Sequence, residues 1–447
     1  MNKKVLSLIA LFAFTSISVA QTNPIITTFI QNQTGITGRH YVEGNSTPIE
    51  DPVLANVQSV DYSDDWVYIT ATGIPAYITG PFLDGNPSLA QNQNAIYKLP
   101  LIPIENTGTP TETNGGNIGI FINGVSLFDY RDGVAWNNDT MNLCGGPGNP
   151  PCPGGPNGNQ DWNRDAIPAE MGGFDCNKAH PAMGNYHHHQ NPSAFNLDLI
   201  VVSNICDTYP ADGLYVIDTE SHSPLIGFAY DGFPIYGAYG FANTDGTGGI
   251  VKMNSSYELP GATTRVNGPD VDGTYFEGYF REDYNYVSHP EGYYLDDHNG
   301  RFAITPEYPE GIYAYYATVD ENHNSTYPYA VGPTFYGNVV AENVSVIDED
   351  TTNYDATLGI ESFNESNLNL VIYPNPAQDF IAIQSNMVNE NLKLELINQL
   401  GQVMLTNQIL QGSTLSIMET HTLYNGIYFL RVSEQNNSKT YKIIIKK

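Results

Sequence analysis

The chain has 447 residues with 48 acidic and only 17 basic side chains, which gives a formal net charge of −31. Charged residues make up 15% and aromatic residues 12%, and there are 42 glycines and 29 prolines. This composition argues against a disordered chain and against a helix-rich cytosolic enzyme, and the length suffices for two or three domains. Nucleic acid and anionic membrane are poor partners, because binding to phosphates relies on Lys and Arg. We therefore expect a mainly β, loop-rich fold.

Residues 1–20 have the pattern of a secretory signal peptide. Lys3 and Lys4 precede an apolar run from Val5 to Phe14, and Ser18-Val19-Ala20 supplies the small residues of a cleavage site. A membrane anchor would need about 20 apolar residues, and this run is too short. No later stretch approaches that length, so we expect an exported protein without a membrane span.

Residues 21–340 are predicted to form one β-rich domain. Short strand-like runs occur at 66–70 and 118–122, separated by clusters of Gly, Pro and Asn. Helix signals are scarce, and no internal shift in composition marks a second boundary.

Export makes the four cysteines informative, because thiols pair in oxidising compartments. Four cysteines allow three connectivities. Cys144 and Cys152 flank a Gly/Pro-rich loop, which favours one bridge there and a second between Cys176 and Cys206. A thiolate metal site is the alternative, but no CxxC pair is present.

Three consecutive histidines, His187, His188 and His189, are the strongest sign of a functional site. In an extended chain His187 and His189 share one face, and Tyr186 and His188 share the other. Two such imidazoles can converge on one ion, and imidazole favours Cu, Zn, Ni or Fe over Ca or Mg. One or two further ligands are needed, and the candidates are His180, His222 and His298, with Glu170 and Asp175 as nearby carboxylates. The alternative is that the histidines only hydrogen-bond backbone groups in a polar core.

Three segments, 186–189, 222–237 and 295–301, together resemble the YHYH family of exported bacterial proteins. The resemblance is strongest over residues 170–336, and it carries the family histidines onto His187 and His189. Two departures weaken it. His188 replaces a tyrosine of the motif, and a second Tyr-His-Tyr-His seen in some relatives corresponds here to 313–316, which has no histidine. A site that needs both motifs is therefore incomplete, and the family brings no assigned activity.

The charge pattern predicts a boundary near the C-terminus. Residues 21–368 carry nine basic and 43 acidic side chains, for a net charge of −34, whereas residues 369–447 carry six basic and five acidic, for +1. Residues 341–368 are rich in Asp, Glu, Asn, Ser and Thr, which indicates an acidic linker.

Residues 369–447 are predicted to form a small β-sandwich with strands at 370–373, 380–383, 392–397, 426–432 and 441–445. The motifs at 373–376, 398–403 and 423–428, and the final Lys446-Lys447, resemble the type A sorting domain of the type IX secretion system. This resemblance implies recognition by the secretion machinery, passage across the outer membrane, and removal of the tail or its exchange for a surface anchor. A carbohydrate-binding sandwich is the alternative.

The sequence thus predicts a secreted or surface-exposed protein that binds copper or zinc through His187, His189 and His180, with His222 or His298 completing the site and Tyr186 as a nearby hydrogen-bond donor. The alternative is a surface adhesion or glycan- or peptide-binding module with structural histidines. No catalytic residue is assigned, because there is no Gly-x-Ser-x-Gly elbow and no carboxylate pair stands out.

Overall fold

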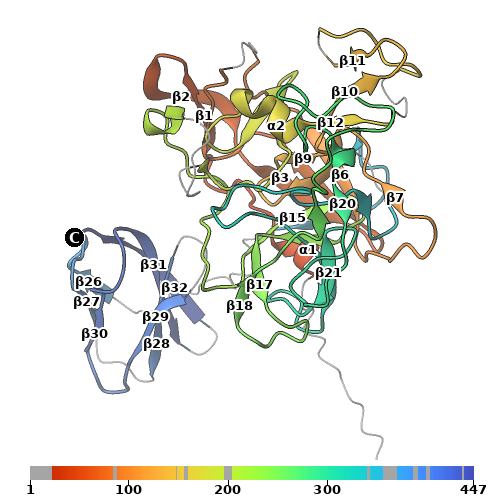
Figure 1. Cartoon of the computed structure of the whole chain (residues 1–447). Helices are drawn as coiled ribbons and strands as arrows, with labels where there is room; N and C mark the ends of the chain where they lie inside the picture. Colours follow the sequence, from red (N-terminus) through yellow and green to blue (C-terminus); the bar gives the residue numbers. More distant parts are fainter. Residues whose placement is uncertain are drawn as a thin grey trace, which may run out of the picture. The chain divides into compact units, whose positions relative to one another are not determined.

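The computed structural model describes residues 23–83, 88–146, 148–155, 160–195, 204–339, 343–355, 370–385, 391–398, 403–434 and 437–447. The predicted signal peptide (1–20) and residues 341–342 and 356–368 of the predicted linker lie outside the described residues. The chain divides into two units, Met1–Tyr354 and Asp355–Lys447, and both are built mainly of β-strands (Figure 1).

The first unit contains two large sheets, and the larger one has eight strands. Their order is β13 (Ala179–Ala182), β14 (Asn185–His188), β9 (Ser126–Phe128), β8 (Asn117–Phe121), β15 (Leu225–Ala229), β16 (Pro234–Tyr236), β22 (Ile312–Tyr316) and β21 (Gly300–Ala303). The predicted run at 118–122 corresponds to β8.

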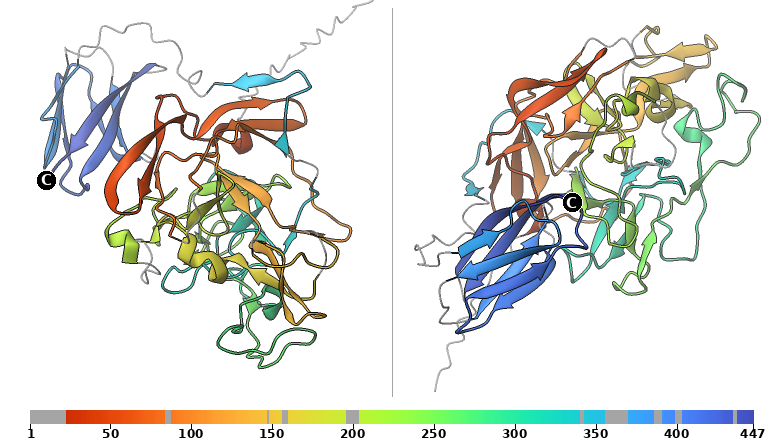
Figure 2. Two further views of the ribbon diagram at one scale, coloured as in Figure 1. Left: turned by 90° about the horizontal axis from the view of Figure 1, so that it is seen from above. Right: turned by 90° about the vertical axis from the view of Figure 1, so that its left-hand side faces the viewer.

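The second large sheet has five strands, in the order β24 (Asn343–Val344), β6 (Ala95–Pro100), β4 (Trp66–Ala71), β3 (Val57–Tyr62) and β25 (Thr352–Tyr354). Strands β24 and β25 fall inside the segment 341–368 that we expected to be a linker, so residues 343–354 are not a linker. Both are edge strands that are held by backbone pairing, so their side chains can be mostly polar and exposed. For this reason their sequences show no apolar periodicity. Figure 2 shows β25, in cyan, beside the red N-terminal strands of the same sheet.

Smaller sheets and short helices complete the first unit. One three-stranded sheet consists of β1 (Thr37–Val42), β2 (Asn45–Leu54) and β5 (Ile78–Thr79), and another of β10 (Arg131–Asn137), β11 (Asn142–Cys144) and β12 (Asn163–Asp165). Three two-stranded sheets pair β17 (Tyr239–Phe241) with β18 (Ile250–Lys252), β19 (Tyr257–Glu258) with β20 (Asn285–Tyr286), and β7 (Thr111–Glu112) with β23 (Thr334–Phe335). The helices are α1 (Pro24–Thr27), α2 (Ala166–Glu170), η1 (Met171–Gly173), η3 (Asn204–Asp207) and η4 (Arg281–Asp283). None of the helices in the described ranges is long and apolar enough to span a membrane.

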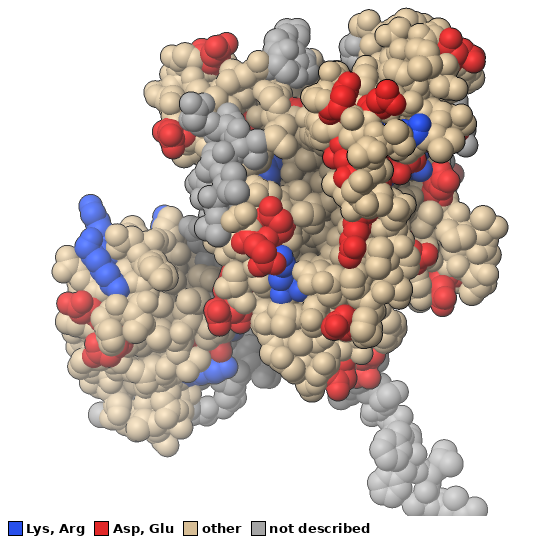
Figure 3. Space-filling view, in the orientation of Figure 1, with Lys and Arg blue, Asp and Glu red and all other residues tan. Residues whose placement is uncertain are grey.

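One apolar core joins the two large sheets. Fully buried side chains come from both of them, including Val60, Ile69, Leu99, Ile120, Phe228 and Ile235. Burying each such side chain contributes about 1.5–3 kcal/mol. Tyrosines fill much of the remaining interior with hydroxyl groups paired, as where Tyr97 Oη lies 2.8 Å from Ser126 Oγ. Acidic side chains occur at many places on the visible surface of this unit, and Lys and Arg are few (Figure 3).

The C-terminal unit consists of two sheets around one core. The sheet orders are β26 (Leu370–Tyr373), β27 (Phe380–Ser385), β30 (Leu415–Glu419), and β29 (Val403–Ile409), β28 (Leu392–Ile397), β31 (Gly426–Glu434), β32 (Asn437–Ile445). The five predicted strands are present, and β29 and β30 are additional. Alternate residues such as Leu394, Leu396 and Leu430 form the core, as a β-sandwich requires.

Both predicted disulfides are confirmed. Cys144 is bonded to Cys152 and Cys176 to Cys206.

Candidate metal centre

The candidate site lies on the hairpin of β13 and β14. The two strands are joined by the two-residue turn Met183-Gly184, in which both residues have positive φ angles, 49° and 87°. Such a type I′ turn matches the twist of the flanking strands and fixes their register. His180 is thereby placed directly opposite His187. Directly opposed residues point to the same face, so the turn brings these two imidazoles together.

The predicted alternation of faces is confirmed. The rings of His180 and His187 are 4.7 Å apart, and those of His187 and His189 are 4.8 Å apart. His188 instead packs against Phe121, and its Nε2 lies 2.8 Å from Tyr77 Oη. Burial, and then the charge of Lys178, lowers the pKa of His188 to about 3, so this ring is a neutral part of the core.

Strand β9 runs parallel to β14 and holds two of the imidazoles in place. Phe128 stacks on His187 with 3.9 Å between the ring centroids. His189 Nδ1 donates to the carbonyl oxygen of Asp129 at 2.6 Å, and His187 Nδ1 donates to that of Asn185 at 2.8 Å. Because a carbonyl oxygen only accepts, the proton of each ring is on Nδ1, and each neutral ring has a bare lone pair on Nε2.

These two lone pairs face each other. His187 Nε2 and His189 Nε2 are 3.1 Å apart, and both residues are buried, with exposed fractions of 2% and 4%. Burial, and then the neighbouring His189 and His180, holds the pKa of His187 well below its ordinary value of 6.5. Burial also lowers the pKa of His189. Two acceptors at this distance repel one another, whereas a cation between them would be attracted to both.

Glu170, at the end of α2, adds a carboxylate to the group. Its Oε2 lies 3.2 Å from His180 Nε2 and 3.4 Å from His189 Nε2. Burial alone would raise the pKa of Glu170, but its hydrogen bond with His180 lowers it below its ordinary value. The helix is positioned by Asp165, whose side-chain oxygen caps it by accepting from Ile167 N at 2.9 Å.

Of the five predicted ligands, three come together. Ligand atoms of His180, His187 and His189 all lie within 4.8 Å of one another, and this is the group of His, Cys, Asp and Glu side chains in the described residues that could hold a metal ion. His222 and His298 lie outside it. His222 Nδ1 donates to the carbonyl of Ser223 at 2.8 Å, and His298 Nδ1 is 2.6 Å from Thr334 Oγ1.

Sheet order explains why the second motif contributes nothing to this group. Four strands, β9, β8, β15 and β16, lie between β14 and β22, which carries residues 313–316. With about 4.8 Å between neighbouring strands, the two motifs are roughly 24 Å apart across the sheet. His298 precedes β21, the strand at the opposite edge from β13. A single site built from both motifs is therefore excluded by the topology.

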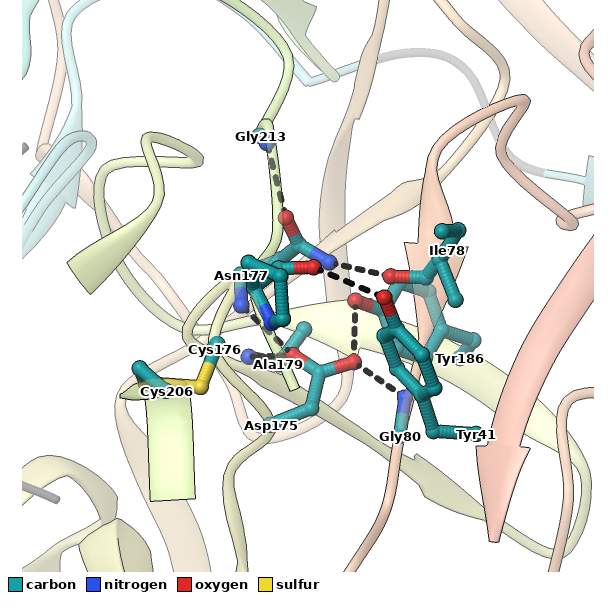
Figure 4. The surroundings of a disulfide bond; sticks show 11 residues. Tyr41, Ile78, Gly80, Asp175, Cys176, Asn177, Ala179, Tyr186, Cys206 and Gly213 are labelled. Carbon is teal, nitrogen blue, oxygen red and sulfur yellow. Dashed lines mark hydrogen bonds between the residues drawn. A yellow bond between two sulfur atoms is a disulfide. The ribbon is translucent and has the colours of Figure 1, made fainter. Parts of the chain in front are cut away.

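Asp175 and Tyr186 belong to the framework of the hairpin (Figure 4). The Asp175 carboxylate accepts four hydrogen bonds, from Gly80 N at 2.8 Å, Tyr186 Oη at 2.9 Å, Asn177 N at 2.9 Å and Ala179 N at 3.3 Å. Asp175 is thus not a ligand. Tyr186, which we expected as a hydrogen-bond donor near the metal, instead donates to Asp175 on the other face of β14. Both residues instead fix the strands next to the Cys176–Cys206 bridge.

Sequence reasoning missed the contribution of residues 128 and 129. The stacking ring and the carbonyl acceptor come from a parallel pairing of β9 with β14, more than 50 residues apart in the chain. A parallel neighbour leaves no local signal, so nothing in the sequence identifies these two residues.

Comparison with protein families agrees with this architecture. A family model described as "YHYH protein" matches residues 96–327, more than half of the chain. The chain belongs to the YHYH protein family. A second model, "Secretion system C-terminal sorting domain", matches residues 371–446. Comparison with curated proteins gives no match.

The YHYH match spans the whole site, including Glu170, all three clustered histidines and β9. The sorting-domain match coincides with the C-terminal unit. The chain is therefore an exported YHYH protein, destined for the outer surface or for secretion through the type IX system, with a buried three-histidine cluster that could hold a metal ion.

Proposed function

We propose that this YHYH domain binds one transition-metal ion, Zn²⁺ or Cu²⁺, through His180, His187 and His189. The observation that carries the proposal is the 3.1 Å separation of His187 Nε2 and His189 Nε2 in rings whose Nδ1 protons are used by carbonyl groups. Imidazole nitrogen selects Zn, Cu, Ni or Fe over Ca and Mg; Cu²⁺ has the highest affinity of the divalent first-row ions, and Zn²⁺ is the usual ion of three-histidine sites.

The surroundings support a preorganised site. Carbonyl groups fix the orientation of two of the rings, and such outer contacts typically change metal affinity 10- to 100-fold when they are lost. The antiparallel strands β13 and β14 and the tight turn between them hold the ring of His180 opposite that of His187. The ligands therefore need little rearrangement to receive the ion.

The test is elemental analysis of the exported, untagged protein after dialysis against metal-free buffer. We expect about one zinc or copper ion per chain in the wild type, and less than a tenth of that after His187→Ala combined with His189→Ala. The matched control is His222→Ala combined with His298→Ala, which removes two imidazoles outside the cluster and should leave the metal content unchanged.

A wild-type protein that holds no metal and takes up neither added ion would overturn the proposal. The histidines would then be structural, and the alternative function, a surface adhesion or a glycan- or peptide-binding module, would be tested on glycan and peptide arrays.

We also propose that the secretion machinery recognises residues 369–447 and that this tail is removed or replaced by a surface anchor. Support comes from the sorting-domain match alone. Intact mass measurement of the extracellular protein tests it, and a species that retains residue 447 would contradict it.

A further inference from the structure

Glu170 differs from the three histidines in its exposure. Its side chain is 25% exposed, whereas those of His180 and His189 are 10% and 4% exposed. The histidines lie on or directly after β13 and β14, and Glu170 lies at the end of the five-residue helix α2. Among the charged and imidazole groups gathered here, Glu170 is thus the one that solvent reaches most easily.

Glu170 Oε2 lies as close to two of the three histidines as two ligands of one ion lie to each other. In a tetrahedral site with metal–ligand bonds of 2.0–2.1 Å, neighbouring ligand atoms are about 3.3 Å apart. The three short separations in the cluster are 3.1 Å between His187 and His189, 3.2 Å between Glu170 and His180, and 3.4 Å between Glu170 and His189. This oxygen itself is buried, so the exposed part of the Glu170 side chain is its other atoms.

The imidazoles of His187 and His189 are held by their protein environment, and the carboxylate is not. Each of the two rings is anchored by a hydrogen bond from Nδ1, and Phe128 covers His187 at 3.9 Å. The ligand oxygen of Glu170 instead contacts two candidate ligands, His180 Nε2 at 3.2 Å and His189 Nε2 at 3.4 Å, and a bound ion would take the place of these contacts. A partly exposed side chain whose ligand oxygen is held only by fellow ligands is displaced at lower cost than imidazoles whose orientation is fixed by the backbone.

We propose that Glu170 is the fourth, exchangeable ligand, and that a small anion from solvent, such as a carboxylate or azide, reaches the metal by replacing it. This inference rests on the proposed metal site. Exogenous ligands would then enter the metal site from the end of α2. They would be small, singly charged anions with an oxygen or nitrogen donor atom.

Azide binding to the Cu²⁺-loaded mature protein tests the inference, with the charge-transfer absorption as the readout. Glu170→Gln removes the competing negative charge, so we expect azide to bind at least tenfold more tightly than in the wild type, with the copper content unchanged. Glu170→Asp, which shortens the side chain by one methylene, should give the same direction of change and guards against an effect of the amide. The matched control is Glu112→Gln, an exposed glutamate outside the cluster, which should bind azide as the wild type does.

The outcomes separate the two proposals. A wild-type protein without metal overturns the metal site itself. A loaded protein whose azide affinity is the same in wild type, Glu170→Gln and Glu170→Asp overturns the exchangeable role of Glu170 while leaving the histidine site intact. Loss of copper from both Glu170 variants also overturns it, because the carboxylate would then be a fixed ligand.

Discussion

Replacing Asp165 with asparagine should stabilise the protein at slightly alkaline pH. Asp165 is fully buried, and its carboxylate accepts from Ile167 N at 2.9 Å and from Tyr329 Oη at 2.7 Å. Burial, only partly offset by these two hydrogen bonds, raises its pKa from 3.8 to about 8. The folded protein therefore holds a proton on Asp165 at pH values where the unfolded chain has released it.

The sign and size of the effect follow from proton linkage. A carboxyl group with a raised pKa in the folded state contributes stability at low pH, and this is lost as the pH rises from about 4 to about 8. Each pH unit in that interval corresponds to about 1.4 kcal/mol, so the wild type loses at most about 6 kcal/mol through this group. Asparagine keeps an oxygen to cap α2 and cannot ionise, so Asp165→Asn should abolish this part of the pH dependence.

Urea unfolding of the mature protein between pH 5 and pH 8 measures the difference. The three tryptophans, Trp66, Trp136 and Trp162, all lie in the first unit, so their fluorescence reports on that unit alone. We expect the variant to gain stability relative to the wild type as the pH rises, with the largest gain at pH 8.

The exposed Asp245 provides a control of opposite sign. Its hydrogen bonds to Thr247 lower its pKa, so Asp245→Asn should slightly weaken the protein at neutral pH and show no gain at pH 8. If Asp165→Asn is destabilising by the same amount at pH 5 and pH 8, the buried carboxylate is ionised throughout and the argument fails.

Three further changes test the framework of the site by urea unfolding. Asp175→Ala leaves four buried donors without an acceptor and should cost about 3–5 kcal/mol, with weaker metal binding; an unchanged midpoint would show that water replaces the carboxylate. Met183→Asn places a residue that tolerates positive φ at a position 95% exposed, and should raise stability by about 0.5–1 kcal/mol. Cys176→Ser combined with Cys206→Ser removes a disulfide whose cysteines are 30 residues apart, and should lower the free energy of unfolding by about 3.5 kcal/mol. A loss no larger than that of an ordinary surface substitution would show that closing this loop does not stabilise the fold.

Local rules predicted the half of the site that lies within one hairpin. Alternation in an extended chain put His187 and His189 on one face, and the seven-residue spacing to His180 is what a two-residue turn needs to place the two histidines opposite each other. The disulfide pairs were also within reach, because the small loop between Cys144 and Cys152 left one remaining pair.

Long-range pairing limited the rest. His222 and His298 were plausible ligands only while the order of the strands was unknown, and the eight-stranded sheet separates them from β14. The carbonyl of Asp129 and the ring of Phe128 reach the site through a parallel neighbour, and sequence patterns do not specify such neighbours. Glu170 and Asp175 were equal candidates as nearby carboxylates, and only the packing of α2 places Glu170 beside His180.

Segment 343–354 failed as a linker prediction for a related reason. Edge strands gain their stability from backbone hydrogen bonds and expose their side chains, so their composition is the same as that of a solvated connector. Apolar patterning in a sequence predicts strands that bury one face, such as β4 and β8. It does not predict strands whose two faces are both exposed.

Strands β24 and β25 protect the five-stranded sheet from pairing with other chains. These two strands, separated by the seven residues 345–351, cover opposite edges of the sheet formed by β6, β4 and β3. A nascent or truncated chain ending before residue 343 would leave both margins open, with rows of free amide and carbonyl groups that recruit other chains. Self-association during export should therefore be suppressed only when the last part of the first unit has emerged, and fragments for expression should extend at least to residue 355.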